Sequence, residues 1–359
     1  MHSPSKTFRI GVDEVGEGTP VYFIADIAAN HDGDLERARR LIDLAAQSGA
    51  QAAKFQHFSA NTIVSDAGFK ALAGKQSHQA GWKKSVYEVY EDASVSLDWT
   101  QPLADACRNA GITFLTTPYA ADLADHVDSF VSAYKVGSGD ITWTDFIRFL
   151  AGKRKPIILA TGAATTDDVT RAMAAALHET PDVALLQCNT NYTGSTANFA
   201  YVQLNVLNTF RCMYPGIVLG LSDHTPGHAA VLGAIALGGK IVEKHFTDDT
   251  TRDGPDHRFS MTPASWREMV ARSRELEAAL GTGLKAIEDN ERETVILQRR
   301  SLRAARALPS GHVVENGDFT PLRPCPADAY PLWNTNAIFG RRLTRAIPAG
   351  DYLRISDLG

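Results

Sequence analysis

From residue 21 onward the chain alternates short apolar runs with longer amphipathic stretches. Eight apolar runs have the length and composition of buried strands, at 21–27, 52–58, 112–118, 132–138, 156–162, 183–189, 216–223 and 240–246. Between most of them lie helical patterns, of which 35–49 and 165–179 are good examples. The first ends on Gly49 and the second opens with Thr165 and acidic residues, which are common at the two ends of a helix.

Eight strand-and-helix units in succession predict a closed parallel barrel. An open, doubly wound sheet is also compatible with alternating units, but the number eight matches the barrel. The last helix is expected to end near Gly281, and the apolar stretch 229–239 is too short for a membrane span and reads as a buried helix. We therefore predict an α/β fold with a (β/α)8 TIM-barrel domain over residues 1–285.

The pattern changes after the barrel. Residues 286–300 read as a charged linker, and 301–359 contain short strand-like pieces with Gly and Pro turns. A small, mostly β domain of about 60 residues is near the lower limit for independent stability, so we expect it to dock on another surface. The connection 58–97 is long for a barrel and rich in polar and aromatic residues, which favours a functional loop.

Composition narrows the class of partner. The chain of 359 residues has a net charge of −5 and a pI of about 6.1, which argues against a general nucleic-acid surface. No apolar segment of signal-peptide or membrane-spanning type is present in the sequence, and no two of the four cysteines have CxxC spacing. We therefore expect a cytoplasmic protein with reduced thiols that binds neither nucleic acid nor membrane.

Polar side chains gather where the predicted strands end. In a barrel these ends and the following loops form the active site. The polar residues at these positions include Asp26, Asn30, Lys54, Gln56, Thr117, Lys135, Ser138, Tyr192, Ser222, His224 and His245. Lys54 and Gln56 are two residues apart and should point to the same side of their strand.

Two lysines lie within apolar strands, Lys54 and Lys135. A buried ammonium group is unfavourable unless an anion meets it. One interpretation is a phosphate or carboxylate site formed by both lysines and nearby hydroxyls. The alternative is structural ion pairing with acidic neighbours such as Asp26 or Asp140, but two lysines at equivalent strand ends favour the anion site.

Two successive strands end on histidines, His224 and His245. Neighbouring strands lie about 4.8 Å apart, so the two imidazoles can share one ion, and two histidines suit a divalent first-row metal. A lone histidine is more often a satisfied core residue; the pair favours metal binding. Asp256 follows in a Gly-Pro loop, where turn formation and ligand binding are equally good explanations.

Taken together, these strand ends resemble the sialic acid synthase family, whose members condense phosphoenolpyruvate with an N-acylated mannose-type sugar. The motifs "DIAANHDG", "AAKFQ", "TTPY", "YKVGSGD", "PIILATGAAT", "GLSDHTPG", "EKHFTDD" and "GPDHRFSM" occur in family order and spacing. The C-terminal region is similar to the antifreeze-like (SAF) domain that ends these synthases. The resemblance runs from about residue 8 to the end of the chain.

The resemblance implies roles for individual residues. His224 and His245 would hold a divalent metal, manganese first, with magnesium or cobalt as alternatives. Phosphoenolpyruvate would meet Lys54, Thr117, Lys135, Ser138 and Ser222, and the sugar would meet Gln56, Tyr192, Asp256 and Arg323. Catalysis would involve Asp26, Lys54, Lys135 and His245. The family also implies a homodimer in which the small domain of one subunit caps the partner's barrel and delivers Arg323.

The implied mechanism has carbon 3 of phosphoenolpyruvate attack the sugar aldehyde, which the metal polarises. Water, activated by Asp26 or by the metal, then adds at carbon 2 and phosphate leaves. The family usually has Glu at position 26, so either a water bridges the shorter reach or Asp26 only orients a ligand. Thr193 replaces a proline, the phosphate-contacting Asn is displaced to 189 or 191, and "RPCPA" replaces a glycine-containing loop.

These departures concern mainly the residues expected to contact the sugar and the loops over it, so they leave the identity of the sugar open. The leading product is N-acetylneuraminate; a synthase of legionaminic or pseudaminic acid, acting on a diacetamido-trideoxyhexose, is the nearest alternative. A related aldol synthase of the keto-acid phosphate group is disfavoured by the complete C-terminal domain. A non-catalytic glycan-binding barrel is disfavoured because the lysines and histidines are retained.

Overall fold

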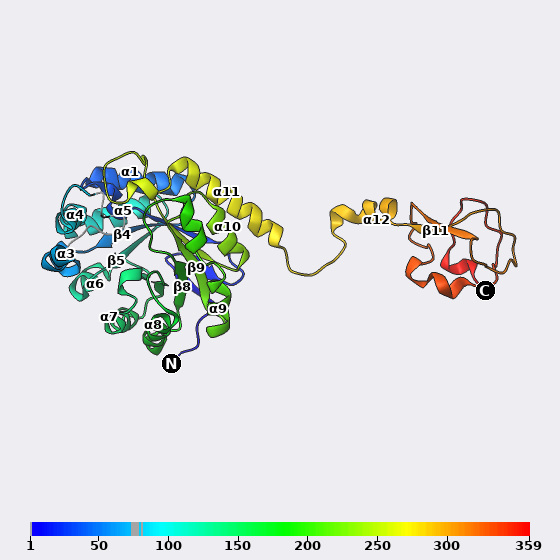
Figure 1. Ribbon diagram of the computed structural model, residues 1–359, viewed down its shortest axis with the longest axis horizontal. Coiled ribbons are helices and arrows are strands. Elements are labelled where there is room, and N and C mark those ends of the chain that lie inside the picture. Colours follow the sequence, from blue (N-terminus) through cyan, green and yellow to red (C-terminus); the bar gives the residue numbers. More distant parts are fainter. Residues whose placement is uncertain (1, 73–78, 80–81) are drawn as a thin grey trace. The chain divides into compact units, whose positions relative to one another are not determined.

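The structure is a computed structural model that describes residues 2–72, 79 and 82–359. The chain forms two compact units, Met1–Gly281 and Thr282–Gly359 (Figure 1). Each unit has its own buried hydrophobic residues.

The first unit is a parallel barrel. Its strands are β3 (Tyr22–Asp26), β4 (Ala52–His57), β5 (Thr113–Pro118), β6 (Tyr134–Val136), β7 (Ile157–Ala160), β8 (Val183–Cys188), β9 (Val218–Asp223) and β10 (Ile241–His245). The hydrogen-bonded order is β5-β4-β3-β10-β9-β8-β7-β6, every pair is parallel, and β5 lies against β6 to complete the ring. This confirms the predicted TIM-type barrel.

Helices surround the strands (Figure 1). They are α1 (Leu35–Gln47), α5 (Thr100–Asn109), α6 (Ala121–Val127), α7 (Thr144–Ala151), α8 (Thr166–Glu179), α9 (Val206–Met213), α10 (Ala229–Ala236) and α11 (Pro263–Leu280). Local sequence explains their starts: Asp34 accepts hydrogen bonds from two backbone N–H groups of α1, and Thr165 and Asp168 form a capping box at α8.

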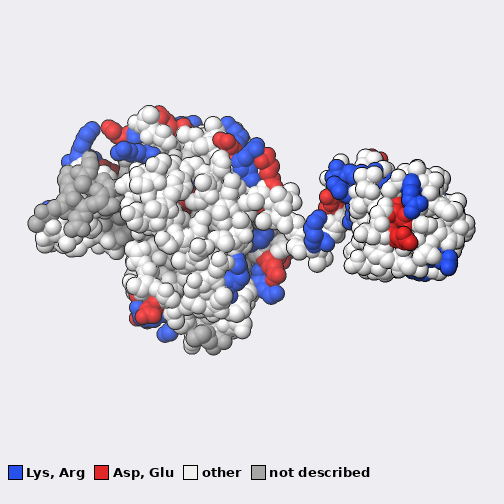
Figure 2. All heavy atoms as spheres, turned by 45° about the vertical axis from the view of Figure 1, so that its right-hand side comes forward, with Lys and Arg blue, Asp and Glu red and all other residues white. Residues whose placement is uncertain are grey.

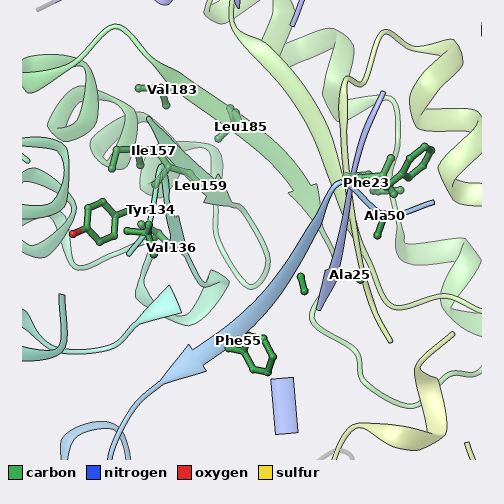
Figure 3. Close-up of a cluster of buried hydrophobic side chains, with 14 of the residues drawn as sticks. Phe23, Ala25, Ala50, Phe55, Tyr134, Val136, Ile157, Leu159, Val183 and Leu185 are labelled. Carbon is green, nitrogen blue, oxygen red and sulfur yellow. The ribbon is translucent and has the colours of Figure 1, made fainter. Parts of the chain in front are cut away.

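Side chains alternate across the barrel wall, as the two-residue period of a strand requires. Phe23, Phe55, Ile157 and Leu185 face outward and belong to the large buried cluster shared with the helices (Figure 3). The inward residues near the strand starts are also apolar and form a second cluster. A hairpin that the sequence analysis did not predict, β1 (Thr7–Ile10) and β2 (Asp13–Gly16), adds its apolar side chains to that inner cluster.

Towards the strand ends the inward positions become polar. Ile24 is followed two residues later by Asp26, Ala52 by Lys54, and Ile241 by Glu243 and then His245. The apolar inner layer therefore supports a polar layer at the carboxyl ends of the strands, where barrel enzymes carry their sites.

In its described residues, the connection after β4 contains three short helices, α2 (Ala60–Ile63), α3 (Asp66–Ala71) and α4 (Val86–Ala93), and a 3-10 turn, η3 (Leu97–Trp99). The sequence analysis expected a long loop at 58–97; residues 73–78, 80 and 81 of it lie outside the described residues. Val89 and Ala93 are one helical turn apart on α4 and so lie on one face of that helix.

The second unit consists of η7 (Asp289–Glu291), α12 (Arg292–Gln298), β11 (Ser301–Ala304), β12 (Phe319–Leu322), η8 (Leu332–Ile338) and η9 (Ile355–Asp357). The segment 286–300, expected as a linker, thus contains a short helix. Regular strands are limited to the antiparallel pair β11 and β12, supplemented by isolated bridges such as Leu308 to Ile347. The hydrophobic core of the second unit includes Leu302, Val314 and Leu353.

Charge is mixed on the surface. On the face shown in Figure 2, and leaving aside the residues drawn in grey, basic and acidic side chains lie interspersed on each unit. Among the described residues, no helix is both long and apolar enough to cross a bilayer.

Candidate active site

A cavity of about 320 Å³ opens among the strand ends of the barrel. Ten of the twelve residues proposed from the sequence line it: Asp26, Lys54, Gln56, Thr117, Lys135, Ser138, Tyr192, Ser222, His224 and His245. Asp256 lines an adjoining cavity of about 230 Å³. Arg323 belongs to the second unit, where its exposed side chain donates from Nε to the carbonyl of Gln298, 2.7 Å away.

Both lysines are buried against carboxylates. Lys54 Nζ lies 2.7 Å from Asp26 Oδ2, and Lys135 Nζ lies 3.3 Å from Glu243 Oε1. Burial raises the pKa of Asp26, although Lys54 opposes that shift. Burial lowers the pKa of Lys54, but attraction to Asp26 and Glu243 outweighs this and leaves it raised. Of the two alternatives weighed for the sequence, ion pairing is observed for both lysines; both also line the 320 Å³ cavity, and the anion site stays a prediction.

Glu243 is a cavity residue that the sequence analysis did not select. It lies two positions before His245, so both side chains point into the barrel. Burial opposes its charge, but Lys135 and Lys54 lower its pKa to about 2. The hydroxyl of Ser222, expected to meet phosphate, donates to Glu243 Oε1 across 3.1 Å. The two-residue spacing from His245 was the signal that could have identified Glu243.

Ser138 is held for hydrogen bonding into the cavity. Its Oγ accepts from the backbone N–H of Gly162 at 3.0 Å, and its hydroxyl also makes a hydrogen bond with the thiol of Cys188. Gly162 has no room for a side chain, since a Cβ there would lie 2.3 Å from Thr190 Cγ2 and 2.8 Å from Ser138 Oγ. The glycine therefore permits the close approach that positions Ser138.

The two histidines face each other with ring centroids 5.4 Å apart. His224 Nδ1 must donate to the carbonyl oxygen of Asn189, 2.9 Å away, because that oxygen can only accept. This fixes the tautomer and leaves a lone pair on His224 Nε2. Burial lowers the pKa of His224 to about 4 and lowers that of His245 as well, so both rings are neutral, as metal ligands must be.

His245 has buried nitrogens close to carboxylates. Its Nε2 lies 3.7 Å from Asp26 Oδ2 and its Nδ1 lies 3.8 Å from Asp256 Oδ2, and Nδ1 makes no hydrogen bond within the described part of the chain. An unsatisfied buried nitrogen is costly, so a missing ligand is a natural explanation. Among the described residues, no group of three or more His, Cys, Asp or Glu side chains is arranged to hold a metal by itself.

Behind the histidines, three residues tie β9 to β10. Lys244 Nζ lies 2.5 Å from Asp223 Oδ2 and donates to the carbonyl of Thr225 at 2.6 Å. Thr225 donates from its backbone N–H and its hydroxyl to Asp223 Oδ1, at 3.0 and 2.8 Å. We call Asp223, Thr225 and Lys244 the strand-end clamp. It brackets His224 and immediately precedes His245.

Aromatic rings cover the histidines. The ring of Tyr192 lies 4.5 Å from that of His224, and the ring of Phe259, in η6 (His257–Phe259), lies 4.9 Å from that of His245. Asn189 and Asn191, the two positions considered for a phosphate-contacting amide, do not line the 320 Å³ cavity.

A network of charges holds the loop that carries Asp256. Asp32 accepts from His257 Nε2 at 2.8 Å and from Arg252 Nε at 2.8 Å, which ties the segment after β10 to the turn after β3. Asp256 in turn accepts from the backbone N–H of Ala29 at 3.2 Å. The side chain of Asp256 is therefore fixed next to His245.

Asp140, in η4 (Ser138–Asp140), also lines the cavity. Burial raises its pKa to about 6, with Lys135 opposing the shift. Its Oδ2 has no hydrogen-bond partner among the described residues. The sequence analysis considered Asp140 only as a possible ion-pair partner for the two buried lysines. A buried carboxyl of this pKa can exchange protons near neutral pH.

The chain is similar to several known proteins along most of its length. An N,N'-diacetyllegionaminic acid synthase of Legionella pneumophila is 32% identical over 96% of this chain and 96% of its own. A pseudaminic acid synthase of Campylobacter jejuni is 28% identical over 94% of this chain and 96% of its own. The crystal structure of N-acetylneuraminic acid synthetase from Leptospira borgpetersenii, in complex with citrate, superposes with a TM-score of 0.70 at 26% identity, covering 82% of this chain and 97% of that one.

Both units match defined families. Residues 299–359 match the SAF domain, and residues 41–285, more than half of the chain, match the NeuB family. With relatives above 30% identity along nearly its whole length, the chain belongs to the NeuB family of synthases.

Proposed function

We propose that this protein condenses phosphoenolpyruvate with the open-chain aldehyde of an N-acylated, mannosamine-type amino sugar, giving a nonulosonic acid and inorganic phosphate. The observation that carries the proposal is the 320 Å³ cavity, which combines two buried lysines and hydroxyl groups with a pair of neutral histidines. The named activities of the relatives, synthases of legionaminic, pseudaminic and N-acetylneuraminic acids, support the same reaction class.

The histidine pair suits a divalent metal, for which we propose manganese, with magnesium or cobalt as alternatives. His224 has a free lone pair on Nε2, and His245 has a buried nitrogen without a hydrogen bond. When bound, such an ion supplies Lewis-acid polarisation of the aldehyde oxygen. Tyr192 and Phe259 cover the pair and limit the access of water to it.

Lys54, Lys135, Ser138 and Thr117 are proposed to bind phosphoenolpyruvate. The lysines offset the charge of its phosphate and carboxylate, and Ser138 lines the same cavity with an Oγ positioned by the backbone N–H of Gly162. An incoming dianion adds negative charge to a cavity that Asp140 also lines, and burial already raises the pKa of Asp140 to about 6, so Asp140 can take up a proton at that moment.

The bond changes balance with one water molecule. Carbon 3 of phosphoenolpyruvate forms a bond to the aldehyde carbon, and the oxygen of water adds at carbon 2. Asp26 is proposed to accept the proton of that water, with Lys54, at 2.7 Å, stabilising the carboxylate. The bond from carbon 2 to the phosphate oxygen then breaks, and phosphate leaves with the proton of the carbon 2 hydroxyl as the ketone forms. The proton accepted by Asp26 balances the one that the aldehyde oxygen gains on becoming a hydroxyl.

Gln56, Tyr192 and Asp256 are proposed to orient the sugar, since all three line the 230 Å³ cavity beside the histidines. We also propose a homodimer in which Arg323 of a second copy reaches the N-acyl group, based on the family resemblance and on the exposed guanidinium. A cytoplasmic location is proposed as well, supported by four cysteines that are all unpaired.

The test measures phosphate released from phosphoenolpyruvate by the purified full-length protein with manganese and a panel of N-acylated hexosamines. We expect release that depends on the sugar and is abolished by a chelator. A His224→Ala variant, which loses one proposed ligand, should show no metal-dependent release. Absence of release with every sugar, despite bound metal, would contradict the proposal and favour a glycan-binding barrel.

A further inference from the structure

Tyr119, the last residue of the motif "TTPY", follows β5 directly and has no part in the function proposed above. Its backbone N–H donates to the carbonyl of His57 at 3.0 Å, which extends the pairing of β5 with β4 by one residue. Its side chain lines both the 320 Å³ cavity and the 230 Å³ cavity. Tyr119 is therefore held at the place where the two proposed substrates meet.

The phenol ring of Tyr119 reaches from one cavity to the other. Phe58, which lines only the 230 Å³ cavity of these two, packs edge-to-face against the ring with the centroids 5.8 Å apart. Gly137, which lines only the 320 Å³ cavity of the two, lies beside the hydroxyl, since a Cβ there would be 3.2 Å from the hydroxyl oxygen. The hydroxyl thus lies at the end of the ring that faces the proposed phosphoenolpyruvate cavity.

The hydroxyl of Tyr119 is a donor without a partner in the described part of the chain, where no residue hydrogen-bonds to it. Burial, together with the nearby charge of Asp140, raises its pKa well above the ordinary value of a tyrosine. The group therefore stays protonated and can donate a hydrogen bond. Once a substrate displaces water from the cavity, a hydroxyl left without an acceptor is unfavourable, so a substrate oxygen is the natural partner.

The neighbours of Gly137 indicate which substrate supplies that oxygen. Lys135 and Ser138, on either side of it in the chain, line the same cavity and are proposed to bind phosphoenolpyruvate. Hydrogen bonds to anionic oxygens are stronger than those to neutral ones. We infer that the Tyr119 hydroxyl, in a position that the missing side chain of Gly137 permits, donates to an anionic oxygen of phosphoenolpyruvate. This inference rests on the proposed function and concerns its binding step.

The experiment measures the Kd of phosphoenolpyruvate for the purified full-length protein by calorimetric titration without sugar, so that no turnover occurs. Tyr119→Phe keeps the ring and its contact with Phe58 and removes one oxygen atom. Because a charge-assisted hydrogen bond is lost, the Kd should rise by about tenfold or more. The matched control is Tyr22→Phe, which removes a phenol hydroxyl 3.5 Å from the carbonyl of Gln51, outside both cavities, and should keep the wild-type Kd.

A second variant tests the position of the hydroxyl. Gly137 has φ −67° and ψ 153°, which any residue can adopt, so Gly137→Ala causes no backbone strain. Its methyl group would push the hydroxyl of Tyr119 aside and should weaken phosphoenolpyruvate binding several-fold. In the Tyr119→Phe background the nearest ring atoms, Cε1 and Cζ, would lie 3.7 Å away in ordinary contact, so Gly137→Ala should add little further loss.

A wild-type Kd in Tyr119→Phe would overturn the inference and leave the proposed reaction standing. The same loss from Gly137→Ala with and without the hydroxyl would also overturn it, because the hydroxyl would then not be the group that the glycine accommodates. If the wild-type protein itself bound no phosphoenolpyruvate, the proposed function would be contradicted and the inference with it.

Discussion

Glu243 shows how a single carboxylate organises the proposed phosphoenolpyruvate cavity. It lies 3.3 Å from Lys135 Nζ and accepts the hydroxyl of Ser222, so it orients two of the groups expected to meet the substrate. Lys135 and Lys54 lower the pKa of Glu243, which favours its charged form. Its second oxygen, Oε2, has no hydrogen-bond partner among the described residues and remains available to a ligand.

We predict that Glu243→Gln raises the KM for phosphoenolpyruvate by about ten- to a hundredfold, because a charge-assisted contact to Lys135 is replaced by a neutral one. The KM for the sugar should change much less, since Glu243 does not line the 230 Å³ cavity that is proposed to hold the sugar. Steady-state kinetics with each substrate varied in turn provides the measurement.

The matched control is Asp128→Asn, which neutralises a carboxylate whose Oδ1 lies 2.8 Å from Lys155 Nζ. Asp128 lines neither the 320 Å³ nor the 230 Å³ cavity. It should leave both KM values at the wild-type level. An unchanged KM for phosphoenolpyruvate in Glu243→Gln would show that Glu243 does not organise this cavity.

At the scale of residues, the two-residue period of strands was enough to predict that most of the candidate-site side chains share one face and line one cavity. Lys54 and Gln56 share a face, as their spacing predicted, and line one cavity. Glu243 carried the same signal relative to His245 but was read as a flanking charge. The ion-pair partner of Lys135 was not predicted: Asp26 and Asp140 were the acidic neighbours considered, whereas Glu243 lies 3.3 Å from Lys135 across the barrel interior, on a strand that does not pair with β6.

At the scale of elements, β9 and β10 are joined where the two histidines emerge. In the strand-end clamp, Asp223 and Lys244 are register partners with side chains only 1% exposed. A buried ion pair is weak evidence for stability, since apolar replacements of similar volume are often neutral or stabilising. Its position around His224 and before His245 indicates that it fixes the separation of the histidines.

We predict that the double variant Asp223→Asn with Lys244→Met weakens manganese binding by tenfold or more, as supporting contacts around metal ligands commonly do. Changing both partners leaves no uncompensated buried charge, so the metal-free protein should unfold within a few degrees of the wild-type temperature. Calorimetric titration of the metal-free protein, together with thermal unfolding, measures both quantities.

A matched pair elsewhere, Asp128→Asn with Lys155→Met, should leave manganese affinity unchanged. If the clamp variant bound manganese as tightly as the wild type, the clamp would have no positioning role. If the wild-type protein itself bound no manganese, the proposed metal site would be wrong, independently of the clamp.

The sequence predicted long, periodic elements better than short ones. All eight barrel strands lie within the ranges expected, because each is an apolar run between amphipathic helices. The hairpin β1–β2 and helix α12 were missed, since four or seven residues carry too little periodicity to be distinguished from a loop. The short helices after β4 were missed for the same reason.

At the scale of the whole molecule, the hydrophobic periodicity of the chain does not predict on which copy's barrel Arg323 acts. The barrel holds every proposed site residue except Arg323, which the small unit carries next to α12. The loop of Arg323 is fixed to that helix also by the backbone N–H of Cys325, which donates to the carbonyl of Ile296 at 2.8 Å. The family resemblance, rather than any pattern in the chain, suggests that this arginine acts on a second copy.

Mixing two inactive variants tests this arrangement. Arg323→Ala retains an intact barrel, whereas His224→Ala retains an intact small unit. In a dimer that exchanges its small units, a mixed pair has one complete site, formed by the barrel of the first variant and the arginine of the second. Random pairing at equal concentrations makes half of the dimers mixed, so activity should return to about a quarter of the wild-type value.

If each subunit instead used its own Arg323, the mixed dimer would contain no complete site and no activity would return. The control replaces the second partner by a His224→Ala, Arg323→Ala double variant, which can pair but supplies no arginine, and should restore nothing. Native mass spectrometry must show the mixed dimer in both cases. Mixed dimers without recovered activity would refute delivery of Arg323 by the partner. Recovery of activity in the control would show that the arginine is not needed. The two outcomes therefore separate the source of Arg323 from its importance.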